Sequence, residues 1–392
     1  MSWKGGCDTI RVGFDVSRVR GHDGVTRYSK ALIGELLRQH PPVEVVLLST
    51  FSRSRLQRLK DIFGSCPHLE IKPVLPNPMA LGNSLRSFVS IVRSVLLSFH
   101  ARRVDVLHLT VPFADRVRAV NTVLTVHDMF PLVLDEYRGE EARREFRRNA
   151  GFMIRRAAAV ITPTEYISRQ VSSLFPSAEE KTCVVNHGAD GIFRPGGEPG
   201  AEPPPQMRNV EDYFLYVGSA YPRKNLRKLL QAWSVLKEDS GIRSRLVLVL
   251  SGVERHLRRF SHFLDKGNET TGIIRLEGVD DPALSRLYSG ARALVFPSKE
   301  EGFGLPVLEA MKSGCPVITS HASCLPEVAG EAALYVDPED ASTISRAMRR
   351  ILLEPPTAGK LIEAGMARAE LFSWEKCAGE TYGVYKKVSE AK

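Results

Sequence analysis

The sequence lacks several features that would direct it to a membrane, an oxidising compartment or a structural metal. None of its apolar stretches reaches the roughly 18 to 20 residues of a membrane-spanning helix, and the opening MSWKGGCDTIRV has no apolar core of a secretory signal. The six cysteines among its 392 residues form no CxxC pair and have no histidines at metal-binding spacing. We therefore expect a cytoplasmic protein with reduced thiols, without a disulfide framework or a zinc site.

Marks of nucleic-acid binding and of metal-assisted catalysis are also missing. Aromatic residues are not interleaved with the basic ones, as single-strand stacking platforms require, and no DNA- or RNA-reading motif is present. Nucleic acid is therefore not expected as a partner. No Asp-x-Asp motif stands at the end of an expected strand, and we expect neither a metal ion nor any other cofactor.

What the sequence does have is an excess of positive charge. Its formal net charge is +9, which favours an acidic partner such as a phosphorylated substrate or an anionic lipid. Arginines gather in the first half, partly between apolar positions at helical spacing: Arg86, Arg93, Arg102, Arg103, Arg143, Arg144, Arg147, Arg148, Arg155 and Arg156. They indicate either a peripheral contact with the inner face of the plasma membrane or ordinary solvated helix surfaces.

The length and patterning predict an α/β protein of two domains. A chain of 392 residues exceeds what one hydrophobic core usually supports. Strand-like apolar runs alternate with amphipathic helical runs in both halves, which indicates parallel sheets. The expected strands are TIRVGFDVSRV, VEVVLLST, DVLHLTV, NTVLTVHD, AAVITPT and KTCVVNH, then YFLYVGS, RLVLVLSG, IIRLEGV, RALVFPS, CPVITS and AALYVD. Helices are expected over 28–40, 85–101 and 140–157.

A segment rich in glycine and proline divides the two halves. Residues 196–209, GGEPGAEPPPQMRN, cannot pack as a regular element and are expected to be an interdomain linker. The domains would then span 1–195 and 210–372. We expect a C-terminal helix over 373–392 that crosses back to the N-terminal domain.

The segment FPSKEEGFGLPVLEAMKSGCPVITS predicts an anion site. A strand ends, a turn with Gly302 and Gly304 follows, and a helix begins at Pro306, where proline is favoured. The glycines allow close approach of the backbone to a ligand. The N–H groups and the positive dipole end of the helix attract phosphate.

Charged residues of both signs accompany this turn. Glu301 and Glu309 stand eight residues apart around it, and carboxylates suit paired sugar hydroxyls because they accept two hydrogen bonds in fixed geometry. Arg223 and Lys224 open a helix after another strand, where their charge opposes the helix dipole. A bound diphosphate would explain this placement. The alternatives are ordinary helix-start acids and a solvated basic pair.

These motifs are shared with a known family. GSxxxRKN, EEGFGLPVLEAMxxGCPVI with its Glu-x7-Glu spacing, and LPEVAGEAALYVDPED resemble retaining glycosyltransferases of family 4. The likeness runs over nearly the whole chain, through VVNHGADGIFRP and the closing FSWEKCAGETYGVYK. It implies a GT-B fold, in which two Rossmann-like domains face a central cleft. The second domain would hold most of a nucleotide-sugar donor, and the first would meet the acceptor.

The resemblance also implies roles for single residues. Arg223 and Lys224 would stabilise the leaving diphosphate, Glu301 would hold hydroxyls of the donor sugar, and Glu309 would bind the ribose. The backbone of four residues would line the sugar and phosphates: Gly302, Phe303, Gly304 and Leu305.

Further donor contacts are implied at other strand ends. Gly218 closes the strand before Arg223 and Lys224, and Gly278 with Val279 would meet the edge of the nucleobase. In the first half, TVHDMFPL resembles the segment that carries the acceptor-side catalytic histidine. His127 would donate a hydrogen bond to the donor sugar and position the reacting centre without acting as a general base.

The loop GHDGVTRYSKALIGELL is similar to the family's N-terminal glycine loop beside the phosphates. Gly21 and Gly24 supply its glycines, with two intervening residues where the commoner pattern has adjacent ones. A plain loop is the alternative interpretation.

The activity implied is a retaining, metal-independent hexosyl transfer in polysaccharide biosynthesis. SAYPRKN and TVHDMFPL resemble bacterial mannosyltransferases most, which favours GDP-mannose as donor, with UDP- and dTDP-sugars open. The acceptor would be a saccharide or a lipid-linked oligosaccharide. A sugar-nucleotide epimerase of the same fold and a non-catalytic two-domain sugar-binding protein are the competing interpretations.

Overall fold

The structure is a computed structural model that divides into two compact units. It describes residues 9–16, 23–38, 43–50, 53–63, 68–74, 83–110, 116–119, 121–134, 139–239, 241–251, 260 and 271–391. Unit 1 comprises Met1–His187 with Trp374–Lys392, and unit 2 comprises Gly188–Ser373. Within the described ranges, no helix combines the length and the apolar character needed to cross a membrane.

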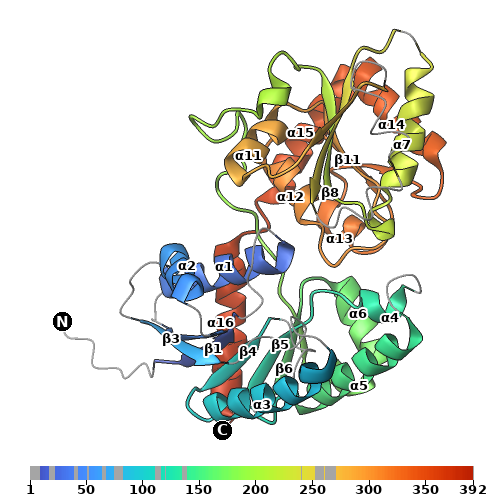
Figure 1. Cartoon of the computed structure of the whole chain (residues 1–392). Coiled ribbons are helices and arrows are strands. Elements are labelled where there is room, and N and C mark those ends of the chain that lie inside the picture. Colours follow the sequence, from blue (N-terminus) through green and yellow to red (C-terminus); the bar gives the residue numbers. More distant parts are fainter. Residues whose placement is uncertain are drawn as a thin grey trace. The chain divides into compact units, whose positions relative to one another are not determined.

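Unit 1 is built on a parallel sheet whose strands follow the order β3-β2-β1-β4-β5-β6-β7 (Figure 1). The strands are β1 (Arg11–Asp15), β2 (Glu44–Thr50), β3 (Leu69–Val74), β4 (Val106–Leu109), β5 (Thr122–Thr125), β6 (Ala159–Thr162) and β7 (Thr182–Val184). Strands β4, β5 and β6 are buried at every position. Continuous burial is typical of a parallel sheet covered on both faces, which explains why most of their residues are apolar.

The helices of unit 1 include one from the far end of the chain. They are α1 (Gly24–Arg38), α2 (Arg53–Phe63), α3 (Asn83–Ala101), α4 (Phe130–Val133), α5 (Glu140–Arg156), α6 (Glu165–Leu174) and α16 (Trp374–Glu390). Helix α16 packs against α1, β4 and β6 (Figure 1). The C-terminal segment is therefore part of the core of unit 1.

One strand of this sheet was not predicted. Strand β3 has the sequence LEIKPV, in which charged residues and Pro73 interrupt the apolar pattern. It lies at the edge of the sheet beside β2, where proline and charged side chains are tolerated because one side of the strand has no ladder partner.

Arg93 is a further departure from the sequence-based expectation. It was grouped with the surface arginines, but its side chain on α3 is fully buried and forms an ion pair with Asp15 at the end of β1. A helical position next to polar residues predicts exposure, and only the tertiary packing of α3 on the sheet buries it. The side chain of Arg86 lies outside the described residues.

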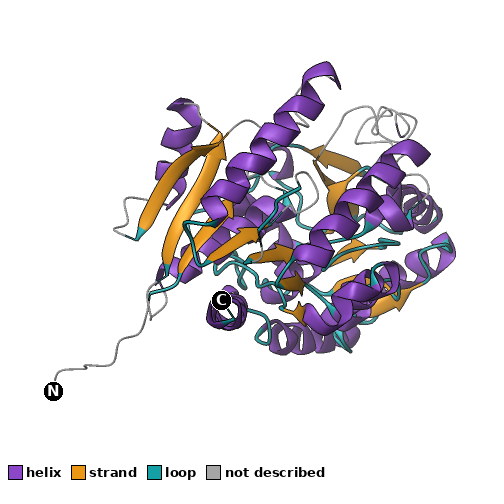
Figure 2. Ribbon diagram, turned by 90° about the horizontal axis from the view of Figure 1, so that it is seen from below, coloured by secondary structure: helices purple, strands orange, loops and turns teal. Residues whose placement is uncertain are grey.

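Unit 2 contains a second parallel sheet, and Figure 2 draws the strands in orange and the helices in purple. The strand order of this sheet is β10-β9-β8-β11-β12-β13. Its strands are β8 (Tyr213–Ser219), β9 (Arg245–Ser251), β10 (Ile273–Leu276), β11 (Ala293–Phe296), β12 (Val317–Ser320) and β13 (Leu334–Val336). Its helices are α7 (Leu226–Lys237), α11 (Asp281–Gly290), α12 (Leu305–Lys312), α13 (Leu325–Ala329), α14 (Ala341–Leu353) and α15 (Pro355–Ala369).

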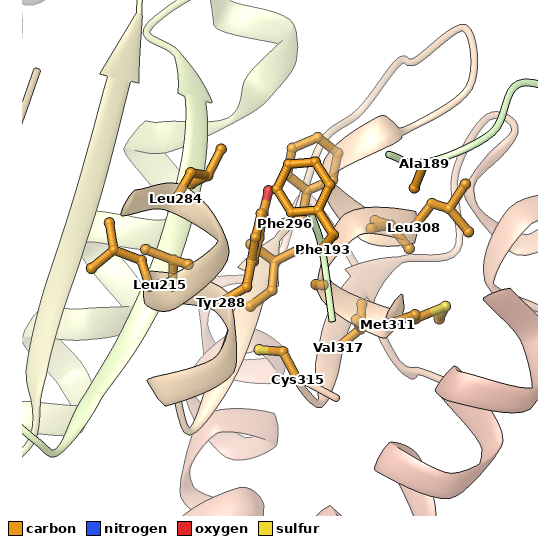
Figure 3. Packing of buried hydrophobic residues seen from close by; sticks show 14 of the residues in the cluster. Ala189, Phe193, Leu215, Leu284, Tyr288, Phe296, Leu308, Met311, Cys315 and Val317 are labelled. Carbon is orange, nitrogen blue, oxygen red and sulfur yellow. The ribbon is translucent and has the colours of Figure 1, made fainter. Parts of the chain in front are cut away.

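The core of unit 2 extends further toward the N-terminus than the sequence suggested. Phe193 is fully buried in it and meets the ring of Tyr288 edge-on, with 5.8 Å between ring centroids (Figure 3). Ala189 and Met207 belong to the same cluster. The chain therefore passes between the units at His187, not after residue 195. Residues 196–209 are grouped with unit 2 and not between the units.

Each sheet has a point at which the strand order reverses, between β1 and β4 in unit 1 and between β8 and β11 in unit 2. Loops that leave neighbouring strands there run to opposite sides of the sheet, and the space at the carboxyl ends of such strands is where doubly wound sheets bind ligands. The predicted site residues follow β8 and β11 in unit 2.

Candidate active site

The turn after β8 places two cations beside the end of β11. Residues Pro222–Lys224 form a short 3-10 turn, and Asn225 follows in the left-handed conformation with φ 59°. The buried Asn225 amide donates to the carbonyl oxygens of Pro297, at 3.0 Å, and Pro338, at 2.7 Å. The backbone N–H of Lys299 donates to the carbonyl of Arg223 at 2.8 Å. These bonds fix the turn against two other loops.

Arg223, Lys224 and Glu301 form one ion cluster. Arg223 Nη1 lies 3.1 Å from Glu301 Oε2, and Lys224 Nζ lies 2.7 Å from Glu301 Oε1. Arg223 Nη1 also donates to the carbonyl of Glu300 at 3.0 Å, and Lys224 Nζ stands 4.8 Å from the centroid of the Phe296 ring. The carboxylate of Glu301 thus pairs with both of the cations that were predicted to bind a diphosphate.

Burial makes this cluster sensitive to its charge balance. The side chains of Arg223, Lys224 and Glu301 are 16%, 12% and 7% exposed. Burial lowers the pKa of Lys224 despite the opposing attraction of Glu301. Burial raises the pKa of Glu301, but the attraction of Lys224 and Arg223 outweighs it and leaves that pKa below its ordinary value. Glu301 is therefore ionised at neutral pH.

The glycine turn that follows Glu301 has the backbone that the sequence predicted. Gly304 precedes α12 with φ 94°, a region that favours glycine, and a Cβ placed there would lie 2.8 Å from Leu325 Cδ2. Helix α12 begins at Leu305, one residue before the predicted Pro306. Phe303 is buried in the core of unit 2, with its ring 5.8 Å from that of Phe372. The turn is thus held by packing on both sides of the glycine.

Glu309 has a different environment from Glu301. It is 3% exposed, and Oε2 accepts a hydrogen bond from the hydroxyl of Tyr288 at 3.0 Å. Its role toward a ribose stays a prediction. Gly278 has φ 64° with open space at its Cβ position, and Val279 packs against the core.

Gly218 lies at the end of β8 where a side chain would be crowded. A Cβ there would be 3.2 Å from the hydroxyl of Tyr216, and this hydroxyl donates to the carbonyl of Ser219 at 2.8 Å. In unit 1, Gly24 is the first residue of α1, whereas Gly21 lies outside the described residues. The contacts of both Gly218 and Gly24 with a donor stay predictions.

His127 follows β5 and is surrounded by aromatic rings. Its ring meets that of Tyr28 edge-on, with 4.7 Å between centroids and 80° between planes, and lies 5.4 Å from that of His187. Burial lowers its pKa to about 4, although a hydrogen bond to the backbone of Thr110 partly opposes this. The imidazole is therefore neutral at pH 7.

The hydrogen bonding of His127 decides which nitrogen is available. A bond that raises the pKa of histidine stabilises its protonated form, so His127 must donate to the Thr110 carbonyl. Nε2 is buried and has no hydrogen-bond partner among the described residues, which leaves Nδ1 as the donor. In the neutral ring Nε2 then accepts a hydrogen bond. The role of His127 toward the donor sugar stays a prediction.

Several residues of these sites were not singled out from the sequence. Asn225 had a signal, since asparagine tolerates the left-handed conformation that the turn requires. The Oγ of Ser323 accepts a hydrogen bond from the Glu301 N–H at 3.2 Å, and no pattern in the sequence indicated this contact. Over the described residues, no three His, Cys, Asp or Glu side chains are grouped so that they could hold a metal ion. The cysteines that the structure describes are free: Cys183, Cys315, Cys324 and Cys377. Cys7 and Cys66 lie outside the described residues.

Comparison with known proteins gives the family. Residues 22–191 match the family model described as Glycosyltransferase Family 4, and residues 203–368 match Glycosyl transferases group 1. The O-antigen chain mannosyltransferase B of Escherichia coli is 32% identical over 272 residues, which cover 69% of this chain and 71% of that protein. The serotype-specific mannosyltransferase WbdA of Escherichia coli is 29% identical over 296 residues, 72% of this chain, which spans about a third of the length of WbdA (35%).

Solved structures agree on the fold. The sucrose-phosphate synthase of Thermosynechococcus elongatus superposes with a TM-score of 0.77 at 20% sequence identity, over 98% of this chain and 100% of that chain. The two parallel sheets with their flanking helices thus match the fold of known glycosyltransferase structures. The chain belongs to the glycosyltransferases of the GT-B fold that join a Glycosyltransferase Family 4 domain to a Glycosyl transferases group 1 domain.

Proposed function

We propose that this glycosyltransferase moves mannose from GDP-mannose to a saccharide or lipid-linked oligosaccharide, with retention of anomeric configuration and without a metal ion. The observation that carries the proposal is the pairing of Arg223 and Lys224 with Glu301 beside the glycine turn of α12. The names of the two Escherichia coli relatives, both mannosyltransferases, support the choice of sugar. Retention and the nucleotide rest on the resemblance to the family.

The charges of the cluster suit a leaving diphosphate. Arg223 and Lys224 supply fixed positive charge in a water-poor setting, where it stabilises developing negative charge more strongly than in water. When a diphosphate shares these cations, Glu301 has spare acceptor capacity for sugar hydroxyls. Fixed cations then perform the neutralisation that a divalent metal performs in other transferases.

His127 would act on the sugar from unit 1. Its neutral ring presents Nε2 as an acceptor, so a hydroxyl of the donor sugar would donate to it. This bond orients the sugar without moving a proton, in agreement with a positioning role. His127→Gln should keep part of the activity because its amide oxygen also accepts, and His127→Ala should keep less.

A screen of nucleotide sugars by thermal shift tests the donor. GDP-mannose should raise the melting temperature in proportion to the logarithm of its concentration, while UDP- and dTDP-sugars should do so only weakly. Arg223→Ala and Lys224→Ala should each lower turnover about a hundredfold or more, the effect of removing a charge-stabilising donor. Unchanged turnover in both variants would refute the assignment of the cations.

Mechanism and alternatives have separate readouts. Transfer activity that persists in excess chelator supports metal independence. Transfer activity that is lost in chelator and returns when magnesium is added contradicts it. The anomeric configuration of the product, measured by NMR, tests retention. An isomerised nucleotide sugar released without acceptor would point to the epimerase instead.

We also propose that unit 1 docks on an anionic membrane surface through α3. Ile91, Val95 and Phe99 are 65%, 62% and 45% exposed, and their spacing of four residues puts them on one helix face. Arg103 lies over the Phe99 ring at 4.4 Å. The backbone N–H groups of residues 116 and 118 donate to serines of α3, so two further exposed arginines border the apolar row.

Vesicle binding tests this surface. The protein should float with vesicles containing phosphatidylglycerol but not with phosphatidylcholine alone, because basic residues are attracted to the anionic surface. Ile91→Ser with Val95→Ser should abolish flotation, and Arg102→Gln with Arg103→Gln should weaken it and reduce its salt dependence. Flotation that survives both pairs of substitutions would contradict the docking surface.

A further inference from the structure

A chain of buried hydrogen bonds runs through the core of unit 1 behind His127. Tyr385 on α16 meets His108 Nδ1 through its hydroxyl at 2.5 Å, and His108 Nε2 meets the Thr125 hydroxyl at 2.7 Å. The Thr125 hydroxyl in turn meets the hydroxyl of Tyr28 on α1 at 3.0 Å. All four side chains are fully buried. The chain therefore joins α16, β4, β5 and α1 in one network.

The groups of this network can form hydrogen bonds that all run in the same direction. Burial, together with the nearby His127, lowers the pKa of His108 to about 3, so its ring is neutral at pH 7. A neutral imidazole donates through one nitrogen and accepts through the other, and each hydroxyl does both. The hydrogen bonds can therefore all run in one direction along the chain and strengthen one another. These three bonds hold the four side chains in fixed orientations.

The last member, Tyr28, lies directly against His127. Its ring contacts His127 edge-on and lies 4.8 Å from the ring of His187. The Trp374 ring is 6.2 Å from Tyr28 and 5.7 Å from His187. His127, Tyr28, His187 and Trp374 thus form a cluster of four rings. The Tyr28 ring is tied to the hydrogen-bond chain through its own hydroxyl.

The places where the chain leaves and re-enters unit 1 belong to the same cluster. His187 is the last residue of the first segment of unit 1, and Trp374 is the first residue of the second. Helix α1, which carries Tyr28, also begins at Gly24, the glycine expected beside the phosphates. Tyr28 therefore contacts His127, belongs to the ring cluster where the chain leaves and re-enters unit 1, and lies on the helix that begins at Gly24.

We propose that Tyr28 is a positioning residue for His127, and that the buried chain through Thr125, His108 and Tyr385 fixes the Tyr28 ring so that His127 Nε2 keeps the orientation needed to bind the donor sugar. Among the described residues, the His127 ring has a hydrogen bond to the backbone of Thr110 and none at Nε2. A single hydrogen bond does not fix the plane of the ring, so the contacts of neighbouring side chains must do so. Tyr28 supplies this packing. The effect on transfer rests on the proposed function, whereas the effect on the ring does not.

A double-mutant cycle tests the catalytic part. Tyr28→Phe keeps the ring and removes the hydroxyl, and it should lower kcat between about tenfold and a hundredfold, the range that a small misplacement of a positioning group produces. In a His127→Ala background the same substitution should lower kcat less than twofold, because the group it positions is gone. Equal losses in both backgrounds would overturn the proposal.

Tyr213→Phe is the matched control. The Tyr213 hydroxyl is also buried, and it donates to the Leu287 carbonyl at 2.9 Å in unit 2. Its removal is expected to lower the stability similarly and to leave kcat within twofold of the wild type. A loss of kcat equal to that of Tyr28→Phe would show that any buried tyrosine hydroxyl has this effect, and would overturn the proposal.

An NMR measurement on the ring needs no donor. In protein with ¹⁵N-labelled histidine rings, the His127 signals are identified by their absence in His127→Gln. Tyr28→Phe should shift or broaden them, and Tyr213→Phe should not. Unchanged His127 signals in Tyr28→Phe overturn the positioning role even if no donor is ever found. If Tyr28→Phe does not fold, Thr125→Val removes the same anchor, and the same outcomes apply.

Discussion

Glu301→Gln keeps the shape of the side chain and removes the charge that Arg223 and Lys224 share. At the observed separations of 3.1 and 2.7 Å, an effective dielectric constant of about 20 gives attractions of about 5 and about 6 kcal/mol. The variant no longer desolvates a carboxylate, which offsets part of this loss. The net fall in the free energy of unfolding should be about 3–5 kcal/mol, as for other buried ion pairs that lose one partner.

The same substitution should change how the protein responds to GDP. In the wild type Glu301 competes with a diphosphate for the two cations, whereas in the variant the cations have no such partner. GDP should therefore stabilise Glu301→Gln more than the wild type, while transfer from GDP-mannose falls because the sugar hydroxyls lose a charged acceptor. Urea unfolding with and without a fixed concentration of GDP measures the stabilisation, and a transfer assay with GDP-mannose measures the loss of activity.

The control for this experiment is an ion pair in the same unit. Lys299 and Glu339 lie 2.6 Å apart but are 38% and 64% exposed, so Glu339→Gln should cost less than about 1 kcal/mol. The cost of Glu301→Gln should also vanish in acid. The pKa of Glu301 lies below its ordinary value of 4.5, so the stability it contributes is complete above that value and is lost as the pH falls through its lower folded pKa. A cost that equals the control, or that persists in strong acid, would refute the reasoning.

Three further perturbations act elsewhere. The pKa values of His108 and His127 are about 3 and about 4, below the ordinary 6.5 of the unfolded chain. The free energy of unfolding should therefore fall as the pH drops below 6.5, by about 2 kcal/mol for each ring at pH 5. Unfolding at pH 5 without proton uptake would contradict this. Arg93→Met removes the buried ion pair with Asp15 and should cost about 3–5 kcal/mol in urea unfolding, part of which Asp15→Asn should restore. Gly304→Ala, at φ 94° and with its Cβ against a leucine, should cost about 1–3 kcal/mol, and a melting temperature equal to the wild type would argue against strain there.

Local sequence patterns predicted the architecture because parallel strands buried on both faces are continuous apolar runs. Strand β3 escaped notice since an edge strand does not need such a run. The end of unit 1 was also misplaced. Glycine and proline at 196–209 suggested a linker, but a single buried side chain, Phe193, decides to which core the preceding residues belong.

The candidate site residues could be selected from the sequence one at a time, and their roles toward a donor stay predictions. Arg223 and Lys224 stand out because their charge opposes a helix dipole, and Glu301 because it precedes a glycine turn. That these residues neutralise one another was not predictable, since Arg223 and Glu301 are 78 positions apart. His108 gave no signal, because one histidine within a buried strand has no distinctive pattern, and its partner Tyr385 is 277 positions away.

The order in which the two units can be completed follows from the path of the chain. Unit 2 is one continuous segment, so all of its core has been synthesised once the chain reaches Ser373. The first 187 residues emerge earlier, but Trp374 and Tyr385 fill positions in their core. The unit that is translated first is therefore the last to close, and nascent chains are expected to expose the apolar site for α16 until translation reaches the final helix.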